Sequence, residues 1–158
     1  MIRDLALANP GGSVVLVGPV SVDVSALRLA NVHLLGPRPY AQLPAWVQAF
    51  DVGIIPYVLN DWTRAVDPLK LLEYLAAGIP VVTTDIPEVL KYRESVAVAG
   101  SRAEFTAAVA RALREGDAAG RARRQAVARR HTWEKRAAEF LGILGEAVAQ
   151  RPPVALPT

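Results

Sequence analysis

Short apolar runs alternate with helical patterns along most of the chain. Runs at 14–17, 32–35, 51–56, 80–83 and 95–99 have the length and composition of strands, and the continuous apolar run at 14–17 is typical of a strand buried on both faces. Helical patterns fall at 39–50, 67–78, 101–115, 118–130 and 132–150, and 86–92 is a short helical turn or loop. Because strands that alternate with helices form parallel sheets, the pattern predicts an α/β fold. We expect a Rossmann-like parallel sheet with helices on both faces.

One of these helices has clear signals at both ends. Asp67 is expected to cap it, and Pro68 to occupy its first position. Gly78 is placed to end the helix in a left-handed conformation. Its inward face is expected to consist of Leu69, Leu72 and Ala76.

Length and composition limit the kind of protein. The 158 residues, 52% of them apolar, fit one domain over 1–150, and the Pro-rich tail at 151–158 is expected to be disordered. The absence of cysteine excludes disulfides, thiolate zinc sites and cysteine nucleophiles. No apolar run approaches the ~20 residues that span a bilayer, so a soluble, cytoplasmic protein is expected.

The net charge of +3 comes from one region. Nine basic and three acidic residues lie between Arg111 and Arg136. A solvated helix face is the preferred interpretation, and peripheral contact with an anionic membrane surface is the alternative. Nucleic acid is not expected as a partner, because no binding module accompanies the basic stretch. His33 and His131 stand apart from any pair of carboxylates, so no metal site is expected.

The segment 60–80 carries the candidate chemistry. Lys70 and Glu73 are three residues apart near the start of a helix that follows a strand, so they share one face. The helix N-terminus and Lys70 favour an anion, and Glu73 could accept hydrogen bonds from two ribose hydroxyls. Arg64 could add a second phosphate contact. The alternative is an ordinary surface ion pair, and a capping Asp67 would compete for the amides that a phosphate would use.

These residues belong to a longer string, DPLKLLEYLAAGIPVVTT, which resembles the nucleotide-sugar motif of GT-B glycosyltransferases of the retaining "group 1" family. The resemblance extends, in order, over VVLVGP, NVHLLGPRPYAQLPAWVQAFDVGIIPY and HTWEKRAAEFL, and covers about 13–147. It implies the C-terminal half of a GT-B fold. It also implies metal-independent transfer of a hexose from a UDP- or GDP-sugar to a sugar or lipid-linked acceptor, as in cell-surface polysaccharide biosynthesis.

The resemblance assigns a role to each matching residue. Glu73 would hold the ribose hydroxyls, and Lys70, with the amides that follow Pro68, would hold the diphosphate. The stretch from Gly36 to Arg38 would lie beside the base. The loop from Tyr57 to Arg64 would face the diphosphate and donor sugar. Its Trp62 is expected to pack within the loop, and a position facing the sugar or acceptor is the alternative. Gly18 would let the backbone approach the nucleotide.

The chain also departs from the family pattern. Ala65 stands where many retaining members have the first of two glutamates. The acceptor domain and the first strand of the donor domain are not recognisable, and that strand would lie between the strands at Val14 and Pro80. An incomplete, N-terminally truncated fold is therefore expected, with the acceptor contacted through a missing domain. No catalytic residue is assigned.

Other interpretations stay open. The chain could be a non-catalytic nucleotide-sugar-binding module or subunit that needs a partner chain, or half of a sugar-nucleotide epimerase. A receiver-like signalling domain is disfavoured, because Asp51 lies at the start of its strand. Trp133 and Phe140 share one face of the last helix and are expected to pack in the core, although this helix crosses towards the other domain in the family. A peripheral position at the inner membrane face is a further expectation.

Overall fold

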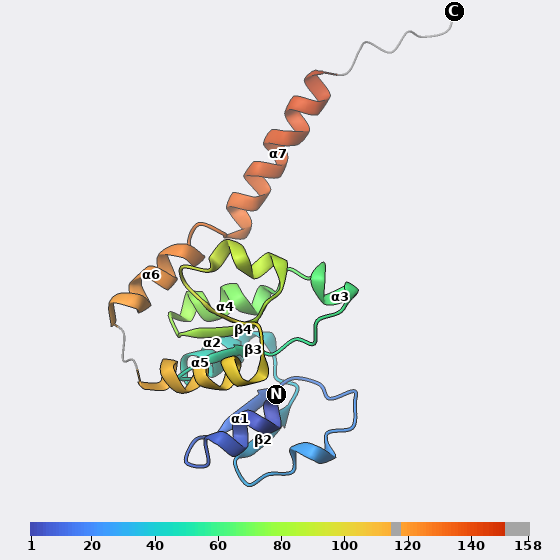
Figure 1. Cartoon of the computed structure of the whole chain (residues 1–158). Coiled ribbons are helices and arrows are strands. Elements are labelled where there is room, and N and C mark those ends of the chain that lie inside the picture. Colours follow the sequence, from blue (N-terminus) through green and yellow to red (C-terminus); the bar gives the residue numbers. More distant parts are fainter. Residues whose placement is uncertain (115–117, 151–158) are drawn as a thin grey trace, which may run out of the picture.

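The computed structural model describes residues 1–114 and 118–150. It has parallel strands with helices on both faces, so the predicted α/β class is confirmed (Figure 1). The strands are β1 (Val14–Val17), β2 (Val32–Gly36), β3 (Gly53–Ile55), β4 (Val81–Thr84) and β5 (Ala97–Ala99). All five lie within one or two residues of the predicted runs, since Gly–Pro pairs and polar loops end most of these runs.

The strands form two separate sheets. β1 pairs with β2, and the second sheet has the order β3-β4-β5. The prediction of an open position between the strands at Val14 and Pro80 was wrong, because β4 is paired on both sides. The open edge that faces β1 belongs instead to β3. Sequence order alone cannot show which neighbour a central strand takes.

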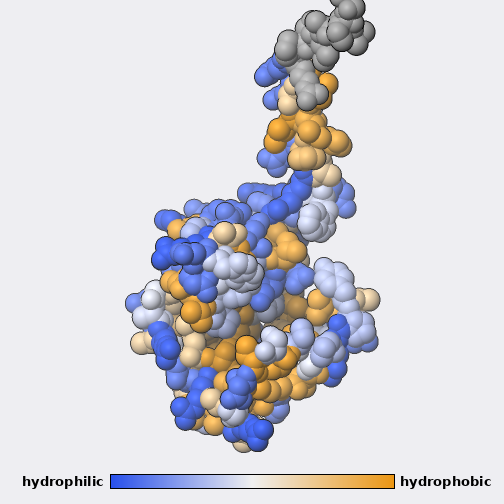
Figure 2. Space-filling model, turned by 90° about the vertical axis from the view of Figure 1, so that its right-hand side faces the viewer, coloured by the Kyte–Doolittle hydropathy of each residue, from blue (hydrophilic) through white to orange (hydrophobic). Residues whose placement is uncertain are grey.

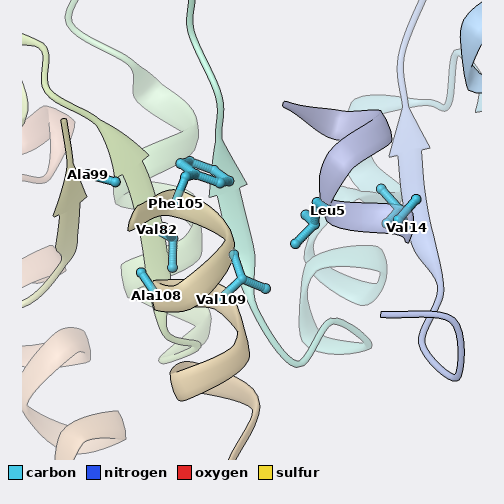
Figure 3. Packing of buried hydrophobic residues seen from close by; sticks show 8 residues of the cluster. Leu5, Val14, Val82, Ala99, Phe105, Ala108 and Val109 are labelled. Carbon is cyan, nitrogen blue, oxygen red and sulfur yellow. The ribbon is translucent and has the colours of Figure 1, made fainter. Parts of the chain in front are cut away.

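Two apolar clusters cover opposite faces of the sheets. On one face, α1 (Ile2–Ala8) and α5 (Arg102–Arg114) bring Leu5 and Phe105 into one cluster with Val14 of β1 and Val82 of β4 (Figure 3). This cluster therefore joins the two sheets. On the other face, α4 (Leu69–Ala77) and the 3-10 helix η3 (Pro87–Tyr92) pack on β3 and β4. The buried residues there are Ile55, Leu71, Leu75, Val81, Ile86, Val89 and Tyr92.

The buried face of α4 differs from the predicted one. Leu71 and Leu75 are fully buried, whereas Leu69 and Ala76 are exposed and Leu72 is partly buried. Apolar residues occur around most of the circumference of this short helix. Two different faces are therefore compatible with the helical spacing of apolar residues, which does not show which face is buried. Its end was predicted correctly: Gly78 has φ 76° and ends the helix in the left-handed conformation.

Two arginines of the basic region have a structural role. They lie on α6 (Ala118–Ala128), which packs on α4. Arg121 donates to the carbonyl of Ala77 at 3.1 Å, and the buried Arg124 donates to the carbonyl of Gly78 at 2.9 Å. Both satisfy carbonyl groups at the C-terminus of α4, where positive charge is favourable. The interpretation as a solvated face is therefore wrong for Arg124 and holds for exposed members such as Arg129 and Arg130.

The segment 18–66 contains further short helices. The predicted helix at 39–50 is divided into η2 (Tyr40–Gln42) and α2 (Leu43–Gln48), and η1 (Ser25–Leu27) lies between β1 and β2. The predicted loop at 57–66 contains α3 (Asp61–Arg64). The Asn60 side chain caps it by accepting from the Thr63 amide at 2.8 Å.

The last helix, α7 (Trp133–Ala149), projects from the body of the molecule (Figures 1 and 2). The prediction of core packing was wrong: Trp133 and Phe140 are 71% and 61% exposed, and no residue of α7 is buried. Leu141, Ile143, Leu144 and Val148 are exposed as well. Within the described ranges, no helix is both long and apolar enough to cross a membrane. The predicted tail at 151–158 and the predicted helix end near Glu115 lie outside the described residues.

Candidate functional site

The predicted site residues follow the carboxyl ends of the strands. Gly18 comes directly after β1, Gly36 ends β2, and Tyr57 follows β3 on the way to α4. Parallel strands bring their carboxyl ends to one edge of a sheet, which is where ligands bind in folds of this class. On the side that carries α3 and the segment before η1, the molecular surface is hollowed (Figure 2).

Gly18 and Gly36 form a joined turn at this edge. Gly18 has φ 143° and Gly36 has φ 70°, conformations that favour glycine. The Gly18 amide donates to the Gly36 carbonyl at 3.0 Å. Apart from the glycine and its two chain neighbours, no heavy atom of the described residues lies within 4 Å of the position that a Cβ would take at either glycine. The turn therefore leaves open space against bare backbone, as the close approach of a ligand requires.

The start of α4 has free amide donors. Pro68 precedes the helix, and no side chain caps it. The Leu71 amide donates to the Pro68 carbonyl, whereas the amides of Leu69 and Lys70 have no acceptor in the described part of the chain. The Lys70 ammonium lies 4.9 Å from the centre of the Tyr57 ring. Lys70 thus lies towards the loop that follows β3, beside amides that can bind an anion.

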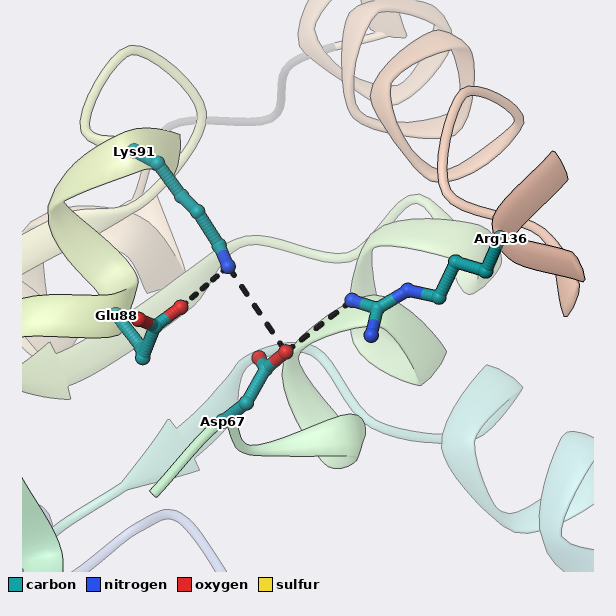
Figure 4. Close-up of polar contacts among 4 residues, drawn as sticks. All are labelled: Asp67, Glu88, Lys91 and Arg136. Carbon is teal, nitrogen blue, oxygen red and sulfur yellow. Dashed lines mark hydrogen bonds and ion pairs between the residues drawn. The ribbon is translucent and has the colours of Figure 1, made fainter. Parts of the chain in front are cut away.

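Asp67 does not cap α4, so this prediction was wrong. Its Oδ2 accepts from Arg136 Nη2 of α7 at 3.1 Å and lies 3.8 Å from Lys91 Nζ of η3 (Figure 4). Lys91 also pairs with Glu88. These two cations, from distant parts of the chain, hold the carboxylate away from the amides of α4. Among the described residues, no carboxylate therefore caps the N-terminus of α4.

Lys91 remains charged in this arrangement. Burial lowers its pKa, but the hydrogen bond with Glu88 and the nearby charges, including that of Asp67, outweigh this effect and raise the pKa overall. The Lys91 charge therefore persists at neutral pH, and Asp67 keeps two cationic partners.

We expect Arg136→Ala to weaken the binding of inorganic diphosphate several-fold. Without Arg136, the Asp67 carboxylate can turn to the amides of α4 and compete with the anion. Adding Asp67→Asn should restore much of the affinity, because the competing charge is removed; isothermal titration of both variants measures this coupling. Equal diphosphate affinities of the wild type and Arg136→Ala would show that binding does not require Asp67 to be held away from the amides of α4.

Glu73 lies one turn after Lys70 and has its own aromatic neighbour. The Tyr40 hydroxyl donates to Glu73 Oε1 at 3.3 Å. Both residues line a pocket of about 260 Å³ between α4 and the η2–α2 segment, whose walls include Leu43, Pro44, Val47 and Ala77. A carboxylate thus stands beside a mainly apolar pocket. Sequence reasoning missed Tyr40, although it comes shortly after the 36–38 stretch expected beside the base.

Two predicted residues are not joined to this arrangement. The Arg38 guanidinium lies 5.7 Å from the Trp46 ring centre and donates to the Pro37 carbonyl, so it lies along α2. Arg64 is exposed at the end of α3, and in the described ranges it has no hydrogen bond or ion pair with Lys70 or Glu73. Trp62 on the same helix is 72% exposed. The structure thus pairs Lys70 with Tyr57 and Glu73 with Tyr40, and leaves Trp62 and Arg64 of α3 exposed to solvent.

Among the residues that the structure describes, no three His, Asp or Glu side chains form a group that could hold a metal ion.

Comparison with known proteins identifies relatives. A family described as "Glycosyl transferase-like" matches residues 1–142. The "Putative teichuronic acid biosynthesis glycosyltransferase TuaH" of Bacillus subtilis (strain 168) is 37% identical over 143 residues. That similarity covers 84% of this chain and 36% of the relative, so the chain spans about a third of the relative's length.

Proposed function

Because the chain belongs to the glycosyl transferase-like family, we propose that it forms the part of a glycosyltransferase that binds the nucleotide-sugar donor. The observation that carries this proposal is the uncapped start of α4, where Lys70 stands beside two free amides. A diphosphate is the group that such an arrangement suits best. Glu73, one turn later, is placed to accept hydrogen bonds from ribose hydroxyls.

The proposed ligand extends from this diphosphate in two directions. The base would lie towards the pocket beside Glu73 and Tyr40, near the Gly36 turn. The donor sugar would lie towards α3, where Trp62 and Arg64 are exposed. A UDP- or GDP-hexose has the required parts, and the acceptor would be a sugar or lipid-linked sugar of a cell-surface glycan.

The proposed chemistry is electrostatic. When the glycosidic bond to the donor phosphate breaks, negative charge grows on the departing diphosphate. Lys70 and the amides of α4 would stabilise that charge in place, without reorganisation and without a metal ion. The groups that bind and activate the acceptor would come from outside this chain, so no residue here is assigned as a catalytic base.

Isothermal titration of the folded chain with UDP, GDP and their hexose derivatives tests the proposal. We expect one base to bind, with an affinity that a metal chelator does not change. A chain that is folded by circular dichroism and binds neither nucleotide would contradict the proposal.

A further inference from the structure

Lys70 carries its charge without an acidic partner. It is partly buried on α4, and no carboxylate of the described residues lies within ion-pair distance of its ammonium group. Glu73, three residues later, accepts from Tyr40 instead. The ammonium lies 4.9 Å from the centre of the Tyr57 ring, within the ~6 Å over which a ring attracts a cation. The ordinary surface ion pair that the spacing of Lys70 and Glu73 left open is therefore not formed.

Tyr57 is held in place from two directions. It follows β3, is partly buried, and packs against the apolar cluster that contains Leu71 and Leu75. The next residue, Val58, is tied to α3, because the buried Thr63 donates its hydroxyl to the Val58 carbonyl at 2.7 Å. The ring of Tyr57 is therefore a fixed surface, in contrast to the flexible four-carbon side chain of a lysine.

The ring of Tyr57, and not its hydroxyl, makes the contact with Lys70. In the part of the chain that the structure describes, this hydroxyl has no hydrogen-bond partner. The face of an aromatic ring attracts a cation through its quadrupole, although the ring has no net charge. A carboxylate in the same place would also hold Lys70, but it would cancel the charge and repel a phosphate. The ring thus restricts the ammonium group and leaves its positive charge available to an anion.

We propose that Tyr57 is a positioning residue for Lys70, whose ammonium its ring holds ready for a diphosphate at the start of α4. The inference rests on the proposed function, because that diphosphate belongs to the proposed donor. A side chain that is restricted before binding loses less conformational entropy when the ligand arrives. The affinity for the diphosphate therefore depends on the fraction of the free protein in which Lys70 already has the binding conformation.

A double-mutant cycle between Tyr57 and Lys70 tests this role, with isothermal titration of the whole chain by inorganic diphosphate, UDP and GDP. We expect Tyr57→Leu to weaken diphosphate binding roughly two- to fivefold, as for the loss of one partly exposed cation–π contact. Tyr57→Phe keeps the ring and should bind like the wild type. In the Lys70→Met background, Tyr57→Leu should cause no further loss, because the side chain that it positions is absent.

NMR of the free protein gives a second readout, which needs neither a ligand nor a variant that folds. The ring current of an aromatic side chain shifts the signals of protons over its face upfield. The side-chain protons of Lys70 should therefore be shifted in the wild type and in Tyr57→Phe, and should have ordinary positions in Tyr57→Leu. Ordinary positions in the wild type would overturn the inference.

The titrations separate the failure of this inference from the failure of the proposed function. Equal losses from Tyr57→Leu with and without Lys70 would overturn the inference, because Tyr57 would then act on the ligand or on the fold. A loss from Tyr57→Phe as large as that from Tyr57→Leu would overturn it as well. A chain that binds diphosphate but neither nucleotide would contradict the proposed function, and the cycle with diphosphate would still decide the role of Tyr57. A chain that binds none of the three would overturn both.

Discussion

Replacing Phe105 with alanine is expected to lower the free energy of unfolding by about 3–5 kcal/mol, the usual loss for a fully buried phenylalanine. Phe105 is completely buried on α5, among residues of α1, β1 and β4 (Figure 3). It therefore contributes to the contact between α5 and both sheets. Within the described residues, no backbone hydrogen bonds between strands join these two sheets. Because whole domains have a stability of only about 5–15 kcal/mol, this loss should leave the chain marginally stable. Urea denaturation followed by circular dichroism measures it.

The matched control is Leu113→Ala on the same helix. Leu113 is 48% exposed, so the same kind of truncation should cost less than about 1 kcal/mol. Equal losses for the two variants would show that α5 does not dock through the cluster seen here.

Strand positions could be predicted because local residues determine them. The run at Val14–Val17 has the predicted bounds, since Gly18-Pro19 cannot continue a strand and the apolar residues need two covered faces. The left-handed Gly78 was likewise predicted from its local position after the helix. Strand ends and left-handed glycines can be predicted because they depend only on residues nearby in the sequence.

The features that were predicted wrongly depend on distant partners. Asp67 looks like a helix cap until Arg136, 69 positions away, takes its carboxylate. Trp133 and Phe140 have the spacing of a core face, but the same spacing also occurs on α7, whose apolar side chains are exposed. The spacing of apolar residues along α7 predicts an apolar face, but it does not identify the surface that would cover this face.

Lys70→Met and Glu73→Gln are expected to weaken nucleotide binding by roughly 10–100-fold, because each removes a charged hydrogen-bonding partner of the ligand. The two losses should differ in kind. Lys70→Met should abolish the preference for the nucleoside diphosphate over the monophosphate, while the preference for the ribose over the 2′-deoxyribose form remains. Glu73→Gln should show the reverse pattern, since its carboxylate is proposed to hold the ribose hydroxyls and not the phosphates.

Titration of each variant with the mono-, di- and 2′-deoxydiphosphate forms of the preferred base separates these roles. Lys135→Met and Glu139→Gln remove the same charges from exposed positions on α7 and should leave all three affinities unchanged. The alternative outcome is that both site variants weaken the binding of all three nucleotides equally while the stability of the protein is unchanged. Lys70 and Glu73 would then act through the overall electrostatic potential of the site. The assignment of one to the diphosphate and the other to the ribose would then be wrong. Selective losses would instead orient the nucleotide along α4, with the phosphates at the helix start and the ribose one turn further on.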